Sequence, residues 1–213
     1  MNPKIKTNLY AILVLGVLSI YLDYIGLKWG FTIGKPLTTL LIIALPLRFP
    51  NKELKRYTRT ITIGLLFCLI GDVFLLEEAY FVFGLIAFLI GHLFFTAAFV
   101  NQQGFKWPLL PGVVLILFAL VLIGLCYSNL NSLFFPILLY ISVIICMSWQ
   151  GIALQARRLN FRYLGWAVSF FLFSDALIAI NKFYTPLGIA GFSILGTYWF
   201  AISLLALSAT KSI

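Results

Sequence analysis

Charged side chains are scarce in this sequence. Only 10% of the residues are Asp, Glu, Lys or Arg, whereas 62% are hydrophobic and the mean hydropathy is +1.07. A water-soluble domain is about a quarter charged and about half apolar. A chain of this composition has too little polar surface to cover itself in water. The composition therefore indicates an integral membrane protein.

Acidic residues and histidine are scarcer still. The chain has six Asp and Glu residues and one histidine against fifteen Lys and Arg residues, which gives a net charge of +9. A basic balance can favour nucleic acid as a partner. In a membrane protein, however, Lys and Arg mark the cytoplasmic loops. We therefore expect no nucleic-acid partner.

Cysteine provides neither a disulfide framework nor a metal-binding motif. The three cysteines, Cys68, Cys126 and Cys146, all fall in apolar stretches, and their number is odd. None of them belongs to a CxxC or Cys/His spacing. We interpret them as small packing residues.

Long apolar runs are what the chain has in abundance. A bilayer core about 30 Å thick is crossed by a helix of about 20 apolar residues. Breaks at charged and turn-rich stretches predict eight such spans, in an all-α polytopic bundle that forms one transmembrane domain over residues 1–213. The predicted spans cover residues 8–27, 34–49, 58–76, 80–100, 107–127, 132–155, 161–182 and 187–209.

Lys and Arg are distributed unevenly between the two sides that eight spans create. Twelve of them lie at the two termini and in the second, fourth and sixth loops. Three lie on the opposite side: Lys28, Lys35 and Lys182. Because cytoplasmic loops carry the excess of Lys and Arg, we expect both termini to face the cytoplasm. The expected location is a bacterial inner membrane, which the chain crosses many times.

Two of the apolar runs contain an aspartate: Asp72 lies in CLIGDVFLL, and Asp175 lies in FLFSDALIAINKF. Titratable residues inside a membrane are costly, so they usually face the bundle interior and have partners. His92 lies near the middle of the fourth predicted span, and Lys35 opens the second, with Pro36 in its first turn. Two aspartates in unequal surroundings can act as proton donor and proton acceptor. This set predicts acid–base chemistry within the membrane.

Other interpretations of these residues stay open. The two aspartates and His92 could be structural residues that hydrogen-bond between helices. One histidine and two aspartates could also supply three metal ligands, but no HxxxH or HxxE spacing accompanies them. We therefore favour metal-free chemistry and expect no cofactor. A Ser-His-Asp triad is weaker, because Ser174 precedes Asp175 without a nucleophile elbow.

The motifs around these residues resemble those of the YhhN family of membrane proteins. The matching motifs are Lys35-Pro36 in GKPLTTLL, Gly71-Asp72 in IGDVFLL, Gly84, Phe88, Gly91 and His92 in FGLIAFLIGHLFF, Ser174-Asp175 in LFSDALIAINKF, and Tyr198 in GTYWFAISLL. Their order across the eight spans carries the resemblance, which covers nearly the whole chain. The family often has a glutamine four residues after the tyrosine, where this chain has Ile202.

The characterised members of that family are lysoplasmalogenases. The resemblance therefore implies that the chain hydrolyses the vinyl ether of a lysoplasmalogen, a lysophospholipid of the bilayer, to a fatty aldehyde and a glycerophospho-head group. On that basis, one of Asp72 and Asp175 protonates the alkene carbon, and the other stabilises the resulting cation and activates water. His92 orients one of the aspartates or relays the proton.

The resemblance also suggests a substrate-binding set. Lys35 and Lys182 are expected to bind the phosphate, Tyr198 is expected to hydrogen-bond the substrate or a carboxylate, and Ser174 belongs to the same set.

Two alternatives to a lysoplasmalogenase stay open. The first alternative is a proton-coupled transporter, because intramembrane Asp and His residues also mark proton relays. An LxxDxxL match between the third and seventh spans would also fit the internal repeat of a transporter. The second is a hydrolase acting on another lysolipid.

Overall fold

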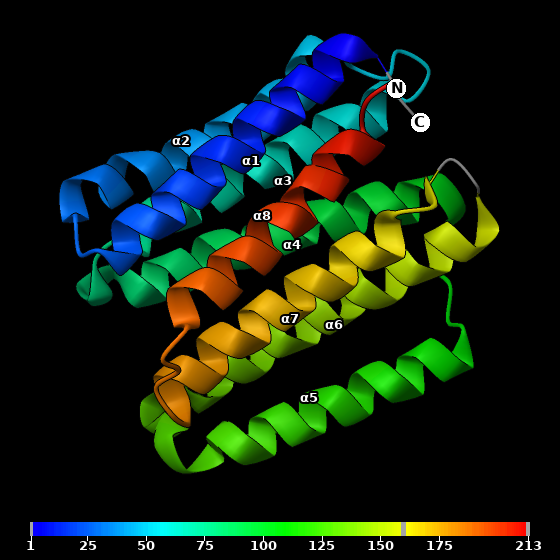
Figure 1. Ribbon diagram of the computed structural model, residues 1–213. Coiled ribbons are helices and arrows are strands. Elements are labelled where there is room, and N and C mark those ends of the chain that lie inside the picture. Colours follow the sequence, from blue (N-terminus) through cyan, green and yellow to red (C-terminus); the bar gives the residue numbers. More distant parts are fainter. Residues whose placement is uncertain (1, 159–160, 212–213) are drawn as a thin grey trace.

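The computed structural model describes residues 2–158 and 161–211, and over these ranges it contains eight α-helices and no β-strand (Figure 1). The helices are α1 (Pro3–Tyr24), α2 (Lys28–Arg48), α3 (Lys55–Phe74), α4 (Phe81–Gln103), α5 (Leu109–Leu130), α6 (Phe134–Arg157), α7 (Leu164–Phe183) and α8 (Ala190–Ser208). Two short 3₁₀ helices, η1 (Glu78–Tyr80) and η2 (Asn131–Leu133), precede α4 and α6. The predicted all-α class is confirmed.

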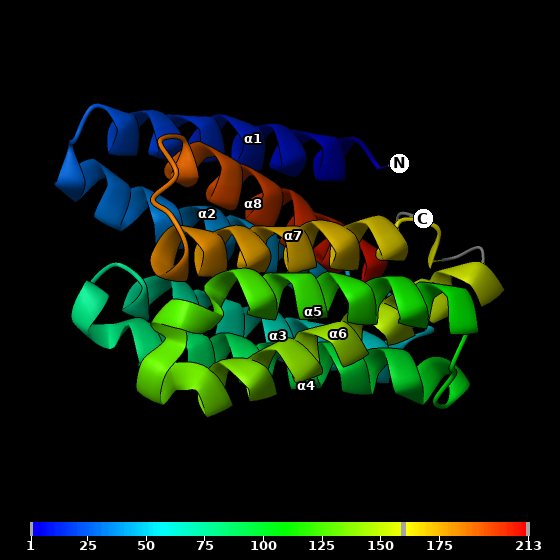
Figure 2. The ribbon, with the colours of Figure 1, turned by 90° about the horizontal axis from the view of Figure 1, so that it is seen from below.

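Glycine and proline residues mark several helix boundaries. Gly26 after α1 and Gly104 after α4 have φ angles of 74° and 72°, a left-handed conformation that glycine adopts without steric cost. Pro108 stands just before α5, where its missing N–H would have no helical partner. The links between the helices are short, and consecutive helices run antiparallel (Figures 1 and 2).

Seven helical stretches among the described residues are long and apolar enough to cross a membrane, rather than the predicted eight. The difference lies in residues 109–157, a 49-residue stretch in which η2 joins α5 directly to α6. The sequence predicts a break here at YSNLNS. The structure turns at Asn131, whose φ is 45°, without an intervening non-helical loop.

The second predicted span begins too late. The sequence predicts its start at residue 34, with Pro36 in the first turn, whereas α2 begins at Lys28 and contains Pro36 in its interior. The first turn of α2 is held against α1, where Gly30 lies close to the side chain of Leu22. Because of this earlier start, Lys35 lies about two turns inside the helix.

The bundle is arranged around α8, which contacts α1, α2, α3 and α7. Figure 1 shows α1, α2 and α3 on one side of α8, α6 and α7 on the other, and α5 at the edge. The start of α1 and the end of α8 lie at the same end of the bundle in Figures 1 and 2. This placement is expected for an even number of antiparallel helices.

Apolar side chains cover the outside of the bundle as well as its interior. On α5, Leu117, Leu120 and Val121 are all exposed. A soluble protein rarely exposes large apolar patches, whereas lipid chains solvate them in a bilayer. The interior, by contrast, contains buried polar residues such as Thr39 and Ser148. The outer surface and the apolar helices together indicate a multi-pass membrane protein.

Close packing of α3 against α4 depends on small residues. A Cβ atom added at Gly91 of α4 would lie 3.1 Å from the carbonyl oxygen of Gly64 in α3. Glycine at such positions lets two helix backbones approach in a membrane bundle. The contact holds α3, which carries Asp72, against α4, which carries His92.

We expect Gly91→Val to separate α3 from α4 and to lower the thermal unfolding midpoint in detergent. Overpacking of this kind costs about 1–3 kcal/mol. The matched control is Gly124→Val on α5, because no atom lies within 4 Å of a Cβ added at Gly124. Equal midpoints for the two variants, measured by intrinsic fluorescence during heating, would contradict this packing.

Candidate active site

Asp72 lies near the end of α3 and is 1% exposed. Its Oδ2 accepts a hydrogen bond from Thr39 Oγ1 of α2 at 2.6 Å and another from the Tyr198 hydroxyl of α8 at 2.8 Å. Trp199 Nε1 donates in turn to Thr39 Oγ1 at 3.3 Å. Donors from two other helices therefore meet the requirement that a buried charge be hydrogen-bonded.

Lys35 of α2 supplies the positive charge beside Asp72. Its Nζ lies 3.9 Å from Asp72 Oδ1, and the residue is 5% exposed. It also interacts electrostatically with Asp23 at the end of α1. The predicted position of Lys35 at the start of its helix is wrong. Because α2 begins at Lys28, Lys35 lies about two turns inside the helix and is buried.

Asp175 of α7 has different surroundings. Its Oδ2 accepts a hydrogen bond from the Tyr140 hydroxyl of α6 at 2.5 Å. His92 Nε2 of α4 lies 3.7 Å from the same oxygen, which is beyond hydrogen-bonding distance. The His92 ring is fully buried, and neither of its nitrogens has a hydrogen-bond partner within the described part of the chain. The ring packs edge-on against Phe171, with centroids 4.7 Å apart.

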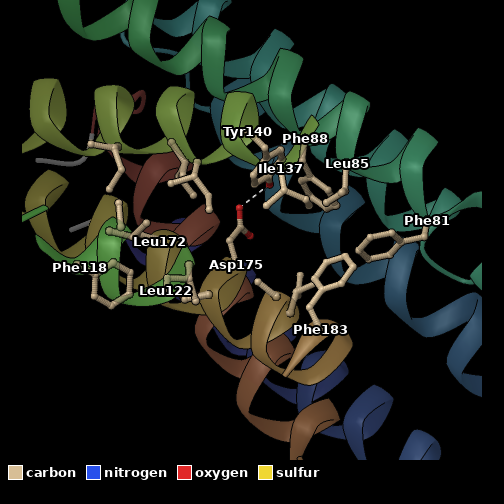
Figure 3. Close-up of a pocket in the computed structure, with 17 residues that line it drawn as sticks. Phe81, Leu85, Phe88, Phe118, Leu122, Ile137, Tyr140, Leu172, Asp175 and Phe183 are labelled. Carbon is tan, nitrogen blue, oxygen red and sulfur yellow. Dashed lines mark hydrogen bonds between the residues drawn. The ribbon is translucent and has the colours of Figure 1, made fainter. Parts of the chain in front are cut away.

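An apolar pocket between α4, α5, α6 and α7 exposes Asp175 and Tyr140 on its wall (Figure 3). Phe81 and Phe183 lie at one end of this pocket, and Leu172 lies toward the other. The pocket has about 560 Å³ of atom-free space including its mouth, but the centre of a water molecule fits into only about 30 Å³ of it. This narrow shape suits a single hydrocarbon chain.

Aromatic rings and a cysteine connect the two aspartates. Phe171, which packs on His92, lies with its ring centroid 5.6 Å from that of Tyr198. Phe88 lines the pocket and also packs against Tyr198, with ring centroids 5.7 Å apart. Cys68, one helical turn before Asp72 on α3, is also buried. The pocket and the first aspartate are therefore separated by a thin layer of side chains.

A polar cavity of about 650 Å³ lies where α1 ends and α2 begins. It is lined by Asp23, Gly26, Lys28, Trp29, Phe31, Thr32, Leu76 and Glu77. Thr32 precedes Lys35 by three residues on α2, and Leu76 follows Asp72 by four residues. The cavity therefore lies about one helical turn from the ion pair.

The structure places the other two predicted binding residues outside the Asp72 and Asp175 clusters. Ser174 is buried and donates a hydrogen bond to the carbonyl oxygen of Ile194 in α8 at 3.0 Å. Lys182 pairs with Glu78 of η1, and its Nζ lies 5.3 Å from the centroid of the Phe81 ring. Because Phe81 lines the apolar pocket, Lys182 lies near one end of that pocket.

Three residues of these clusters are absent from the sequence-based set. Thr39 and Tyr140 donate to the aspartates, and Trp199 donates to Thr39. Thr39 follows Lys35 by four residues, a spacing that puts both on one face of a helix. Tyr140 lies within an apolar run, away from the span ends where tyrosine usually anchors a helix at the interface. Both patterns are visible in the sequence and are signals for this site.

The candidate metal ligands do not come together. In residues 2–158 and 161–211, no group of three or more His, Cys, Asp or Glu side chains could hold a metal ion. His92 lies beside Asp175, whereas Asp72 is held by hydroxyl groups and Lys35. The three-ligand alternative considered from the sequence is therefore not formed in the described residues.

Comparison with known proteins identifies relatives over most of the chain. The model of the YhhN family matches residues 30–209. Human lysoplasmalogenase TMEM86A is 35% identical over 164 residues, which cover 71% of this chain and 65% of that protein. Human lysoplasmalogenase TMEM86B is 31% identical over 159 residues, which cover 73% of this chain and 66% of that protein.

A bacterial relative is covered more fully. The uncharacterized membrane protein YhhN of Escherichia coli O157:H7 is 32% identical over 167 residues, which cover 77% of this chain and 76% of that protein. The match with the human relatives spans about two thirds of their length. No solved structure matches the chain significantly.

We expect Lys35→Met to destabilise the protein by about 3 kcal/mol, because it leaves the Asp72 carboxylate buried without its cation. The double variant Lys35→Met/Asp72→Asn should recover most of the loss, since the amide is neutral. Thermal unfolding in detergent measures both. Glu78→Gln, which breaks the more exposed pair with Lys182, is the control and should have little effect. A double variant less stable than Lys35→Met would contradict the pairing.

Proposed function

The chain belongs to the YhhN family, and we propose that it is a membrane-embedded hydrolase that cleaves the vinyl ether bond of a lysoplasmalogen. Relatives that are named lysoplasmalogenases support this class of reaction. The observation that carries the proposal is a carboxyl group, Asp175, on the wall of a narrow apolar pocket. A second carboxylate, Asp72, is paired with a lysine close by.

In this proposal the pocket binds the alkenyl chain with the vinyl ether beside Asp175. The chain then lies among the apolar side chains toward Leu172, and the glycerol and phosphate lie toward Phe81 and Phe183. Lys182 follows Asp175 by seven residues, or about 10 Å along α7. That distance suits a lysine that binds the phosphate. Its partner Glu78 then either gives up its ion pair with Lys182 or binds the ammonium of the head group.

The two aspartates take different roles because their surroundings differ. Asp72 accepts two hydrogen bonds and faces Lys35, and these partners stabilise a carboxylate. Asp175 has one hydroxyl partner, lies beside His92 without a hydrogen bond to it, and otherwise faces apolar side chains. This setting suits a neutral carboxylic acid. Asp175 is therefore the proton donor, and Asp72 is the anion and the base.

The reaction follows from these roles. Asp175 transfers its proton to the alkene carbon that bears the hydrocarbon chain, and the ether oxygen and its carbon share the positive charge as an oxocarbenium ion. The Asp72 carboxylate stabilises that cation electrostatically. Water then adds to the cationic carbon while Asp72 accepts a proton from it. The resulting hemiacetal collapses to an aldehyde, and the glycerol oxygen leaves with a proton.

The water molecule enters from the side of Asp72. The polar cavity lies about one turn from the Lys35–Asp72 pair and is lined by hydrophilic residues such as Thr32 and Glu77. The opposite side of the site is the apolar pocket. Phe88 lines that pocket and packs against Tyr198, so movement of this ring brings Asp72 and the substrate together.

The remaining residues position the two aspartates. Tyr140 and Tyr198 hold the carboxyl groups through their hydroxyls. After the reaction Asp72 releases to the water of the polar cavity the proton that it took from the attacking water. His92, which packs beside Asp175, relays a proton from water back to that carboxylate, so both carboxyl groups return to their starting states. Ser174 ties α7 to the Ile194 carbonyl of α8, which fixes the register of the helix that carries the acid.

We also propose that α5 and α6 cross the membrane separately. Their combined 49 residues would extend about 74 Å as one helix, more than twice the bilayer core. Two crossings restore the eight spans that the sequence predicts. Both termini then face the side with twelve Lys and Arg residues, the cytoplasm.

Purified protein should release fatty aldehyde from a 1-alkenyl lysophosphoethanolamine. We expect Asp175→Asn and Asp72→Asn each to lower turnover by about 100- to 10,000-fold, because each removes an acid–base group. Glu53→Gln, a carboxylate-to-amide change in the exposed α2–α3 link, is the matched control. Full turnover in both aspartate variants would contradict the assignment.

The same assay separates the alternatives. Fatty acid released from an ester-linked lysolipid, without aldehyde from the ether, indicates a hydrolase with a different substrate. Neither product indicates a transporter. Aldehyde that disappears with a chelator and returns with added metal indicates metal-assisted hydrolysis.

Filling the pocket should select against long chains. We expect Ala119→Phe, which places a ring in the pocket wall of α5, to lower kcat/KM about tenfold for an 18-carbon alkenyl chain and much less for an 8-carbon chain. The control is Val121→Phe, which adds the same ring at an exposed position two residues away. Equal loss for both chain lengths would show that this pocket does not hold the chain.

A further inference from the structure

A surface groove at the opposite end of the bundle from the polar cavity has no role in the proposed reaction. It lies between the end of α2 and the start of α3 and has a volume of about 360 Å³. Apolar residues line one part, among them Pro46, Leu47 and Ile63. Lys52, Lys55 and Arg59 line the other part.

The three cations of this groove are not neutralised by the protein. Lys52, Lys55 and Arg59 are exposed, and none of them forms an ion pair or a cation–π contact within the described residues. Lys55 and Arg59 are four residues apart on α3, where like charges repel and destabilise a helix. Glu53 lies in the same link but pairs with none of them. An anion bound here would relieve the repulsion.

The apolar part of the groove restricts what that anion can be. Leu47 is 63% exposed, and together with Ile63 it continues the groove from the cations onto the apolar sides of α2 and α3. A soluble phosphate would leave this surface empty, whereas a phospholipid joins a phosphate to an acyl chain and can cover both parts of the groove. Basic pockets at the ends of membrane helices bind anionic head groups in the same way.

We propose that this groove is a binding site for an anionic phospholipid. Its phosphate contacts Lys52, Lys55 and Arg59, and one acyl chain lies along Leu47 and Ile63. The site is independent of the proposed hydrolysis, because the lipid is a ligand here and not a substrate.

The position of the groove gives the lipid a structural consequence. The α2–α3 link is joined to the end of α8 by a hydrogen bond from Asn51 N to the Ala209 carbonyl at 3.1 Å. Thr58 Oγ1 donates to the same carbonyl at 3.0 Å, and Thr58 also lines the groove. Bound lipid therefore holds α2, α3 and α8 together, and a ligand that binds the folded state raises its stability.

The test uses the full chain in a neutral detergent with phosphatidylglycerol or phosphatidylcholine added. We expect phosphatidylglycerol to raise the thermal unfolding midpoint by several degrees and phosphatidylcholine to leave it nearly unchanged. Native mass spectrometry should show one tightly bound phosphatidylglycerol. Equal effects of the two lipids would overturn the proposal.

Variants locate the site. Lys52→Gln/Lys55→Gln/Arg59→Gln should weaken phosphatidylglycerol binding at least tenfold, and Leu47→Gln should weaken it several-fold. The control Lys4→Gln/Lys6→Gln/Lys106→Gln removes three cations elsewhere and should bind normally. Phosphatidylglycerol binding that survives the first triple variant, or is lost equally in the control, would overturn the site.

Inorganic phosphate is the last comparison. We expect it to give no shift in the unfolding midpoint at the same concentration, because it cannot use the apolar wall. A shift equal to that of phosphatidylglycerol would overturn the lipid as occupant. If the triple variant does not fold, the Leu47→Gln variant is compared with the control variant instead. Native mass spectrometry then counts the lipid bound to each, and equal counts would overturn the site.

Discussion

The arrangement of the site depends on how the charge of Asp72 is neutralised inside an apolar bundle. Burying a carboxylate without partners in such surroundings costs a large free energy, so hydrogen-bond donors and a cation have to pack against it. Thr39 and Lys35 come from α2, and Tyr198 comes from α8. One carboxyl group of α3 thus fixes the positions of two other helices. Polar contacts of this kind give a membrane bundle its specificity, because lipid chains are as apolar as the helices themselves.

Around that fixed point the bundle provides two environments of opposite character. On one side, Asp72 is close to a polar cavity and to Lys35. On the other, Asp175 faces a narrow pocket of apolar side chains. Hydrolysis of a lipid ether needs both, because the hydrocarbon chain and the water molecule have to reach the same bond from different phases. The rings of Phe88, Phe171 and Tyr198 pack against one another between these two environments.

The two ends of the bundle also differ. Carboxylates accompany the lysines at the end that holds Lys182 and the polar cavity, where Glu78, Glu77 and Asp23 lie. The other end has the groove between α2 and α3, whose three cations have no protein partner among the described residues. A zwitterionic head group fits the first charge pattern and an anionic one the second. This difference separates the proposed substrate from the proposed bound lipid.

The sequence alone determined that the chain is helical and membrane-embedded, because apolar runs of this length have few other stable forms. It also singled out Asp72, Asp175 and His92 as candidates, since polar residues are conspicuous in apolar runs, and the resemblance to a family added Tyr198. It did not reveal that α2 begins at Lys28 and carries Lys35 into the interior, because the contact of Gly30 with Leu22 joins segments of two helices. The division of the aspartates between an ion-paired cluster and an apolar pocket was decided only by the tertiary structure. Side chains from α2, α6 and α8 create those surroundings, and their distances are set by helix packing rather than by spacing along the chain.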